Sequence, residues 1–131
     1  MEPIAKPGAS DKVYPPAKLA LLVEALVSEG VSLHDALNHV GVPHDKLHSA
    51  EFLVSVEQLI AACRNAIQLS RDPQLPLRAG SSIHVSAYGM YGYAILCGTD
   101  FRRILEFAVK YHVLATPLSA ISFAEHDGMG V

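Results

Sequence analysis

Histidine spacing offers the first candidate chemistry in the sequence. His44 and His48 are four residues apart, so a helix through them would place both imidazoles on one face, as a metal site requires. No third ligand stands at a fixed spacing, and the residues between them do not form the His-Glu-x-x-His pattern of zinc hydrolases. We interpret both as solvated surface histidines and expect neither a metal nor another cofactor.

A second group of candidates combines tyrosines with one histidine. Tyr88, Tyr91, Tyr93 and Tyr111 gather in one region, and His112 follows the last of them on an apolar helical stripe. A tyrosine suits the wall of a small-molecule pocket or an interface, and it equally suits an ordinary core. The histidine either points into a ligand cavity or bonds a backbone carbonyl at the edge of the core. Tyr91, Tyr111 and His112 are therefore our candidates for a small-molecule pocket.

Other catalytic patterns are missing from the sequence. There is no Gly-x-Ser-x-Gly elbow, and neither Cys63 nor Cys97 lies in a motif that would lower the pKa of its thiol. We expect both to be buried, reduced thiols. The glycines at 89 and 92 lack the Gly-x-Gly and the lysine of a phosphate-binding loop. We predict that the chain is not an enzyme, and a metal-dependent enzyme built on His44 and His48 remains an alternative.

The tyrosines belong to the segment 88–112, which predicts two helices joined at a tight break. Gly89 and Gly92 share one face of the first helix and would let another backbone approach closely. Gly98 suits a position of positive φ, and Thr99 suits the N-cap of the second helix. We take Gly89, Gly92, Tyr93 and Thr99 as a structural signature. The apolar stripe of the second helix comprises Phe101, Ile104, Leu105, Ala108, Tyr111 and His112.

Upstream of this pair, caps and apolar periodicity predict further helices. A helix over 17–29 would bury one stripe and end at Gly30, and an S-x-x-Q capping box at Ser55 would begin another. Shorter helical pieces are expected over 33–40, 43–47 and 75–79. The buried stripe of the first helix would be Leu19, Leu22, Val23, Leu26 and Val27. The buried face of the helix after Ser55 would be Val56, Leu59, Ile60, Cys63 and Ile67.

The C-terminal residues change character. Ile121 and Phe123 alternate with smaller or polar residues as in a half-buried strand, and Asp127 with Gly128 suits a hairpin turn. Too few residues follow for an ordinary returning strand, so we expect the sequence to stop within a domain, or this strand to pair with a neighbouring chain. The predicted fold is mainly α, with about five to seven helices and a C-terminal β-strand or hairpin, as part of a larger α+β domain.

Composition narrows the functional classes. Half of the 131 residues are hydrophobic and 18% are charged, which favours a folded chain with a sizeable core. The net charge of −3 comes from scattered residues, so no basic face is predicted to grip nucleic acid. The segment EGVSLHDALNHVGVPHDKL has the length of a helix-turn-helix but offers base edges only His44, Asp45 and Lys46. No signal peptide or membrane span is predicted, and we expect a cytoplasmic protein.

The order of these features resembles a known family. The matching pieces are LVSEG, VSLHDALNHVGVPHDKL, SRDPQLPLRAG and above all YGMYGYAILCGTDFRRILEFAVKYH, across about residues 17 to 126. Together they resemble the N-terminal effector-binding and dimerisation domain, of the arabinose-binding type, of AraC-type transcriptional regulators.

The resemblance implies a one-component bacterial regulator. Its N-terminal domain would bind a small-molecule effector and form a homodimer, while a C-terminal pair of helix-turn-helix motifs would bind promoter DNA. Residues 1–14 are rich in Pro, Gly, Ser and Lys, which by itself predicts a flexible tail. Residues 15–131 would then be the N-terminal part of the sensory domain, with the rest of that domain and the DNA-binding domain absent. The alternative is a protein-interaction or scaffold module without a small-molecule ligand. The family motif assigns no effector-contacting residue.

Overall fold

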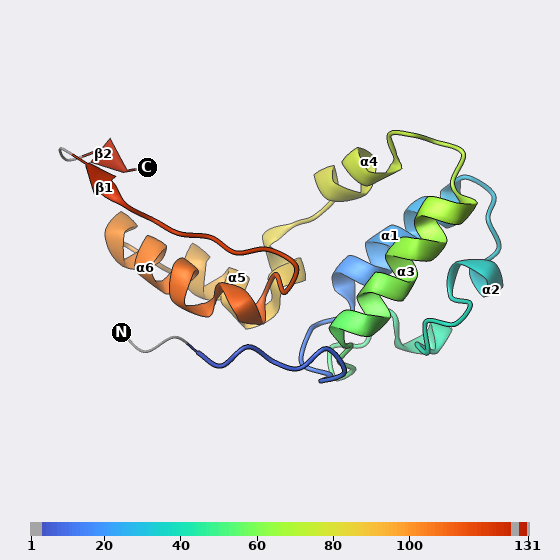
Figure 1. The fold of residues 1–131 in the computed structure, drawn as a ribbon, viewed down its shortest axis with the longest axis horizontal. Helices are drawn as coiled ribbons and strands as arrows, with labels where there is room; N and C mark the ends of the chain where they lie inside the picture. The colour runs from blue at the N-terminus through green and yellow to red at the C-terminus, as the bar shows by residue number, and fades with distance from the viewer. Residues whose placement is uncertain (1–3, 127–128, 131) are drawn as a thin grey trace.

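Two helical groups stand at opposite ends of an elongated chain (Figure 1). The computed structural model describes residues 4–126 and 129–130. At one end α1 (Ala17–Ser28) packs against α3 (Val56–Leu69), and at the other α5 (Gly89–Leu96) packs against α6 (Phe101–Tyr111). The smaller elements are α2 (Leu33–Ala36), η1 (His44–Lys46), α4 (Leu75–Ser81), η2 (Val85–Tyr88) and η3 (His112–Leu114). The main core lies between α1 and α3, and α4 leads from it toward the second pair.

Helix α1 follows the sequence prediction closely. It starts after Pro16, a residue tolerated at a helix start, and the chain turns away at Gly30, whose φ of +92° suits glycine. Leu19, Val23 and Leu26 are at most 1% exposed, which confirms the predicted helical stripe. Val27 was expected in that stripe and is 43% exposed, so that part of the prediction is wrong.

Helix α3 begins at the predicted capping box. The Ser55 hydroxyl accepts from the Gln58 backbone N–H at 3.3 Å, and the Gln58 side chain accepts from the Ser55 N–H at 3.0 Å. The residues that α3 buries fully are small, Ala62 and Ala66. Ile67, predicted on the buried face, is 79% exposed. The larger α3 side chains Val56 and Leu59 are only partly buried against the same core.

Side-chain amides fasten the loop between α1 and α3. Ser32 caps α2 by accepting from the Asp35 N–H, as its position predicts, but α2 ends at Ala36 rather than at residue 40. Asn65 Nδ2 donates to the carbonyls of Ala36 and Asn38 at 3.0 and 2.8 Å. These bonds satisfy backbone carbonyls that the short helix leaves free.

The segment before α1 is attached to the core. Tyr14 is 5% exposed and exchanges two backbone hydrogen bonds with Val54, at 3.1 and 2.8 Å. The Glu57 N–H donates to the Ala9 carbonyl at 3.0 Å. Tyr14, which the sequence assigned to a flexible tail, is therefore a core residue.

The glycines of α5 act as predicted in part. A Cβ on Gly92 would lie 2.1 Å from the Val85 carbonyl oxygen, so this glycine permits α5 to pack on η2. Gly89 begins the helix at a φ of +58°. Gly98 does not have positive φ, and the N-cap of α6 is Asp100, whose carboxylate accepts from the Arg103 N–H at 3.1 Å. The prediction of Thr99 as the N-cap is therefore wrong.

The predicted C-terminal β-strand is also wrong. Ile121 and Phe123 lie in a stretch without regular secondary structure, and Ile121 is 45% exposed. The only paired extended residues in the described C-terminal part are β1 (Glu125–His126) and β2 (Met129–Gly130), two residues each. The expected turn at Asp127 and Gly128 lies outside the described residues. Alternation alone makes no strand, because a strand needs a neighbouring strand for its backbone groups. The described fold is helical rather than part of an α+β sheet domain.

Across the described residues, no helix combines the length and the apolar character needed to span a bilayer.

Candidate functional site

Three of the predicted tyrosines, Tyr88, Tyr91 and Tyr111, form a half-buried aromatic cluster with Phe107. The Tyr91 ring lies 6.4 Å from Tyr88 and 5.9 Å from Phe107, and Phe107 lies 4.6 Å from Tyr111, between centroids. The Tyr91 hydroxyl donates to the Ala108 carbonyl at 3.1 Å. Burial, with a smaller effect of Tyr88, raises the pKa of the Tyr91 phenol. Tyr91 and Tyr111 are thus joined through Phe107, which stacks on the Tyr91 ring and is tilted against the Tyr111 ring.

His112 and Tyr93 take no part in these aromatic contacts. A ring nitrogen of His112 is 2.8 Å from Thr116 Oγ1, and Nε2 is 3.0 Å from Ser119 Oγ. Its ring contacts hydroxyl groups of the following turn, rather than the backbone carbonyl that the sequence suggested. Tyr93 is 53% exposed.

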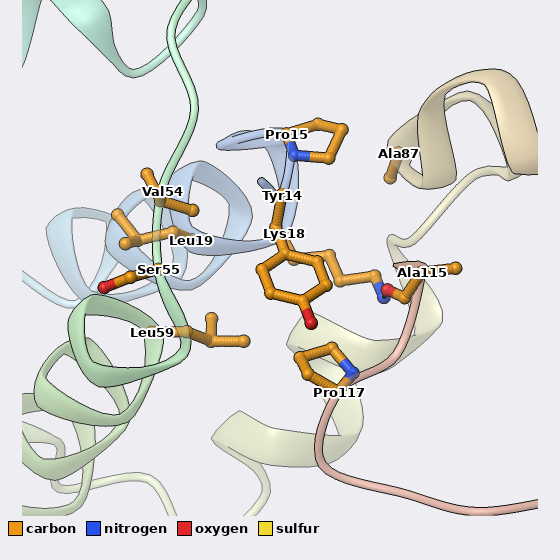
Figure 2. A pocket seen from close by; sticks show the side chains of 10 residues that line it. All are labelled: Tyr14, Pro15, Lys18, Leu19, Val54, Ser55, Leu59, Ala87, Ala115 and Pro117. Carbon is orange, nitrogen blue, oxygen red and sulfur yellow. Dashed lines mark hydrogen bonds between the residues drawn. The ribbon is translucent and has the colours of Figure 1, made fainter. Parts of the chain in front are cut away.

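A small cavity beside Lys18 is lined by residues of both helical groups (Figure 2). Lys18 Nζ donates to the Ala115 carbonyl at 2.6 Å and lies 4.1 Å from the centroid of the Tyr88 ring. The Tyr14 hydroxyl donates to the Val113 carbonyl at 3.1 Å. Burial lowers the pKa of Lys18 to about 8 and, with a smaller effect of Asp11, raises the pKa of Tyr14. The free volume is only about 20 Å³, so this cavity has room for water and none for a metabolite.

A larger hollow lies between α1, α3 and α4, and we call it the α3–α4 groove. Its free volume of about 550 Å³ falls in the range of small-molecule pockets. Most of its wall is apolar, and a polar end is formed by the break between the two helices. Its lining comprises Leu22, Cys63, Ala66, Ile67, Ser70, Arg71, Asp72, Pro73, Leu75 and Pro76. Burial raises the pKa of the Cys63 thiol, so this wall is uncharged at neutral pH.

Ion pairs hold α4 at the polar end of the groove. Arg78 Nε lies 2.9 Å from an Asp72 carboxylate oxygen, and an Arg78 terminal nitrogen lies 3.3 Å from Glu29. Glu29 also accepts from the Ser70 hydroxyl at 2.8 Å and from the Arg71 backbone N–H at 3.1 Å. Glu29 at the end of α1 therefore anchors both the break after α3 and the helix that follows.

The histidines at 44 and 48 do not assemble a metal site. His48 Nε2 lies 3.3 Å from a Glu24 carboxylate oxygen at the surface, and His44 lines a shallow hollow with His34 and His39. Within residues 4–126 and 129–130, no three potential His, Cys, Asp or Glu ligands lie close enough to hold a metal ion.

Sequence reasoning missed the α3–α4 groove. Its walls come from ordinary helix residues such as Leu22, Ala66 and Leu75, which carry no motif. The one available signal was the SRDPQLP stretch, in which a proline and charged residues separate one predicted helix from the next. Such a break can leave a hollow between two helices, but the sequence does not show which other residues line that hollow.

Comparisons with known proteins agree on one family. The family model for the N-terminal arabinose-binding domain of AraC transcription regulators matches residues 30–131. The ornithine utilization regulator of Pseudomonas aeruginosa is 28% identical over 101 residues, which are 77% of this chain and 30% of that protein. Two uncharacterized HTH-type transcriptional regulators, of Mycobacterium tuberculosis and Mycobacterium bovis, are each 25% identical over 112 residues, 84% of this chain and 32% of theirs. The chain thus spans about a third of the length of these relatives. No solved structure matches.

Proposed function

We infer a sensory role from one premise: this chain belongs to the family of N-terminal arabinose-binding domains of AraC transcription regulators. We propose that it binds a small-molecule effector and forms a homodimer within a one-component bacterial regulator. The relatives are about three times as long and two are named HTH-type, so we assign promoter binding to a helix-turn-helix domain in the rest of the whole protein. We further propose that this regulator works in the cytoplasm and is not an enzyme.

The α3–α4 groove carries the sensory proposal. It has ligand size, an apolar wall and a polar end, the combination typical of small-molecule sites. A relative of this chain is named an ornithine utilization regulator, which ties one family member to a small metabolite. The earlier candidates, Tyr91, Tyr111 and His112, remain a second prediction for effector contact, although their contacts described above are with one another and with the following turn.

A thermal-shift screen tests effector sensing directly. Amino acids, sugars and aliphatic acids are added to the 131-residue chain, and the unfolding temperature is recorded. A ligand that binds only the folded chain at about 100 times its Kd adds roughly 2.7 kcal/mol of stability. Ile67→Glu should abolish the shift, because Ile67 lines the groove and is 79% exposed, so folding should survive. Leu77→Glu is the matched control, since Leu77 is 73% exposed and does not line the groove.

Dimerisation and DNA binding need separate measurements. Sedimentation equilibrium of the 131-residue chain should give a concentration-dependent mass approaching that of a dimer. A mobility-shift assay should show no sequence-specific binding, because the net charge is −3 and the basic residues are scattered. A monomer at all concentrations contradicts the first expectation, and a specific shifted band contradicts the second.

A protein-interaction module without an effector is the second candidate. The observation that favours it is the exposure of large apolar side chains on α5 and α6, including Met90 at 83%, Phe101 at 74% and Leu96 at 64%. Exposed apolar side chains on two packed helices would suit a contact with another protein surface if they form one patch. The same thermal-shift screen separates the two functions, because a pure interaction module gains no stability from any small molecule.

A further inference from the structure

The polar end of the α3–α4 groove contains four charged side chains, of which three are paired. Both oxygens of Asp72 are occupied: one accepts from the Gln74 N–H at 2.8 Å, the other faces Arg78 at 2.9 Å. Both oxygens of Glu29 are occupied as well, by Ser70, Arg78 and the Arg71 backbone. The two carboxylates therefore have their partners within the protein.

The guanidinium of Arg71 is the fourth group. Over the described ranges 4–126 and 129–130 it has no hydrogen bond or ion pair; only its backbone N–H is engaged. Arg71 nevertheless lines the groove, directly after the apolar wall formed by Ala66 and Ile67. A free guanidinium next to an apolar surface complements a molecule with an anionic head and an apolar body, and its planar fork fits a carboxylate.

We propose that the α3–α4 groove binds a small organic carboxylate with an apolar body, which places its carboxylate at Arg71 and its body against Ala66, Ile67 and Leu75. This ligand class deepens the sensory function proposed above and rests on it. A cationic head is disfavoured, because it would meet the like charge of Arg71 in the groove, while Glu29 and Asp72 already pair with Arg78. A neutral head of the same size would lose only the charged contact.

Two cysteines provide the readout. Cys63 lines the groove and is partly buried, whereas Cys97 is exposed and does not line it. Iodoacetamide alkylates the thiolate form, so the reaction is run at mildly alkaline pH and followed at each cysteine by peptide mass spectrometry. A groove ligand slows alkylation of Cys63 and leaves the rate at Cys97 unchanged, so every sample contains its own reference.

The probes are 3-phenylpropionate, 3-phenylpropanol and 3-phenylpropylamine, which share one apolar body and differ in the head. The carboxylate should protect Cys63 with a Kd about fivefold lower than the alcohol, the value of one partly exposed charge pair. The amine should bind more weakly than both. Arg71→Gln should make acid and alcohol equal, while Arg64→Gln, an exposed arginine on α3 that does not line the groove, should preserve the fivefold ratio.

Several outcomes overturn the proposal. These are equal protection by all three probes, strongest protection by the amine, no protection of Cys63, or an acid preference that survives Arg71→Gln. Circular dichroism of each variant shows whether the helices are intact. If these probes fail but another compound class raises the unfolding temperature and Ile67→Glu abolishes that effect, the carboxylate assignment is wrong and the sensory function stands. If no class stabilises the chain, both are wrong.

Discussion

Gly92 allows a strong test of how α5 packs. In Gly92→Ala the new Cβ would lie 2.1 Å from the Val85 carbonyl oxygen and 2.9 Å from Val85 Cγ1. The nearer atom belongs to the backbone, so no rotamer change relieves the contact, and α5 and η2 must move apart by more than ~1 Å.

The magnitude follows from two opposing effects. Alanine favours a helix interior over glycine by about 1 kcal/mol. Overpacking against a backbone costs about 1–3 kcal/mol, toward the upper end where nothing can rotate away. We therefore expect a net loss of about 1–2 kcal/mol, which lowers the unfolding temperature by roughly 4–8 °C in a chain of this length.

Urea unfolding followed by tyrosine fluorescence measures this loss. The chain has no tryptophan, and four of its five tyrosines lie in residues 88–111, so the signal reports mainly on the α5–α6 pair. Gly80→Ala in α4 is the matched control, because nothing lies within 4 Å of its new Cβ. It should be neutral or stabilise by about 0.5–1 kcal/mol. If Gly92→Ala is as stable as Gly80→Ala with unchanged circular dichroism, α5 does not pack on η2 as described.

Three further changes test other parts of the fold. Ser55→Ala removes a buried capping box and should lower the free energy of unfolding in urea by about 1–2 kcal/mol. Ser32→Ala removes an exposed cap and should lower it by at most about 1 kcal/mol. Equal losses in the two variants would contradict the role of the buried box. The pKa of Lys18 is about 8 in the folded chain and near 10.5 when unperturbed, so the unfolded chain keeps a proton that the folded chain loses between these values. The contribution of Lys18 to stability should therefore rise from about pH 8 to 10, so wild-type stability should rise over this range relative to that of Lys18→Met; the same pH dependence in both chains refutes the assignment. Tyr91→Phe loses the bond to the Ala108 carbonyl and should lower stability by about 1 kcal/mol, whereas the half-exposed Tyr93, changed to Phe, should have no effect in the same thermal scan.

The parts of the fold that could be predicted are those encoded locally. Pro16 and Gly30 bound α1, and Ser55 with Gln58 begins α3, because each device acts within a few residues of itself. The same logic fails where two neighbours offer the same chemistry. Thr99 and the aspartate after it can both cap a helix, and only the path of the chain decides between them.

Burial was harder to predict, because apolar periodicity identifies the apolar face of a helix but not which residues of that face are fully buried. Val27 and Ile67 belong to apolar stripes, yet they are 43% and 79% exposed. Helices α1 and α3 approach through Ala62 and Ala66, whose small side chains allow close contact. Which of several apolar neighbours faces inward depends on the helix that packs against them. The sequence of one helix does not identify that packing partner.

The candidate site shows the same limit from the functional side. Tyr91, Tyr111 and His112 attracted interest by residue type, and the structure gives the two tyrosines aromatic contacts and the histidine hydroxyl partners. The α3–α4 groove instead depends on where α4 comes to rest. A helix of seven residues is too short to be stable alone. Its position is set by the buried Leu75 and by Arg78, which reaches back to α1 across a large sequence distance.

Helix α4 therefore lies between the α1–α3 group and the α5–α6 pair along the chain. It forms one wall of the α3–α4 groove, and the chain that leaves it passes within a few residues into η2, which contacts α1 and supports Gly92 of α5. Its attachment consists of one buried leucine and exchangeable ion pairs, whereas α1 and α3 share a continuous apolar core. Of the elements around the groove, α4 is thus the one whose displacement costs the least buried apolar surface. The ligand proposed for the groove would contact Leu75 of α4 and Arg71 in the break before it, and along the chain α4 is followed by η2 and then α5.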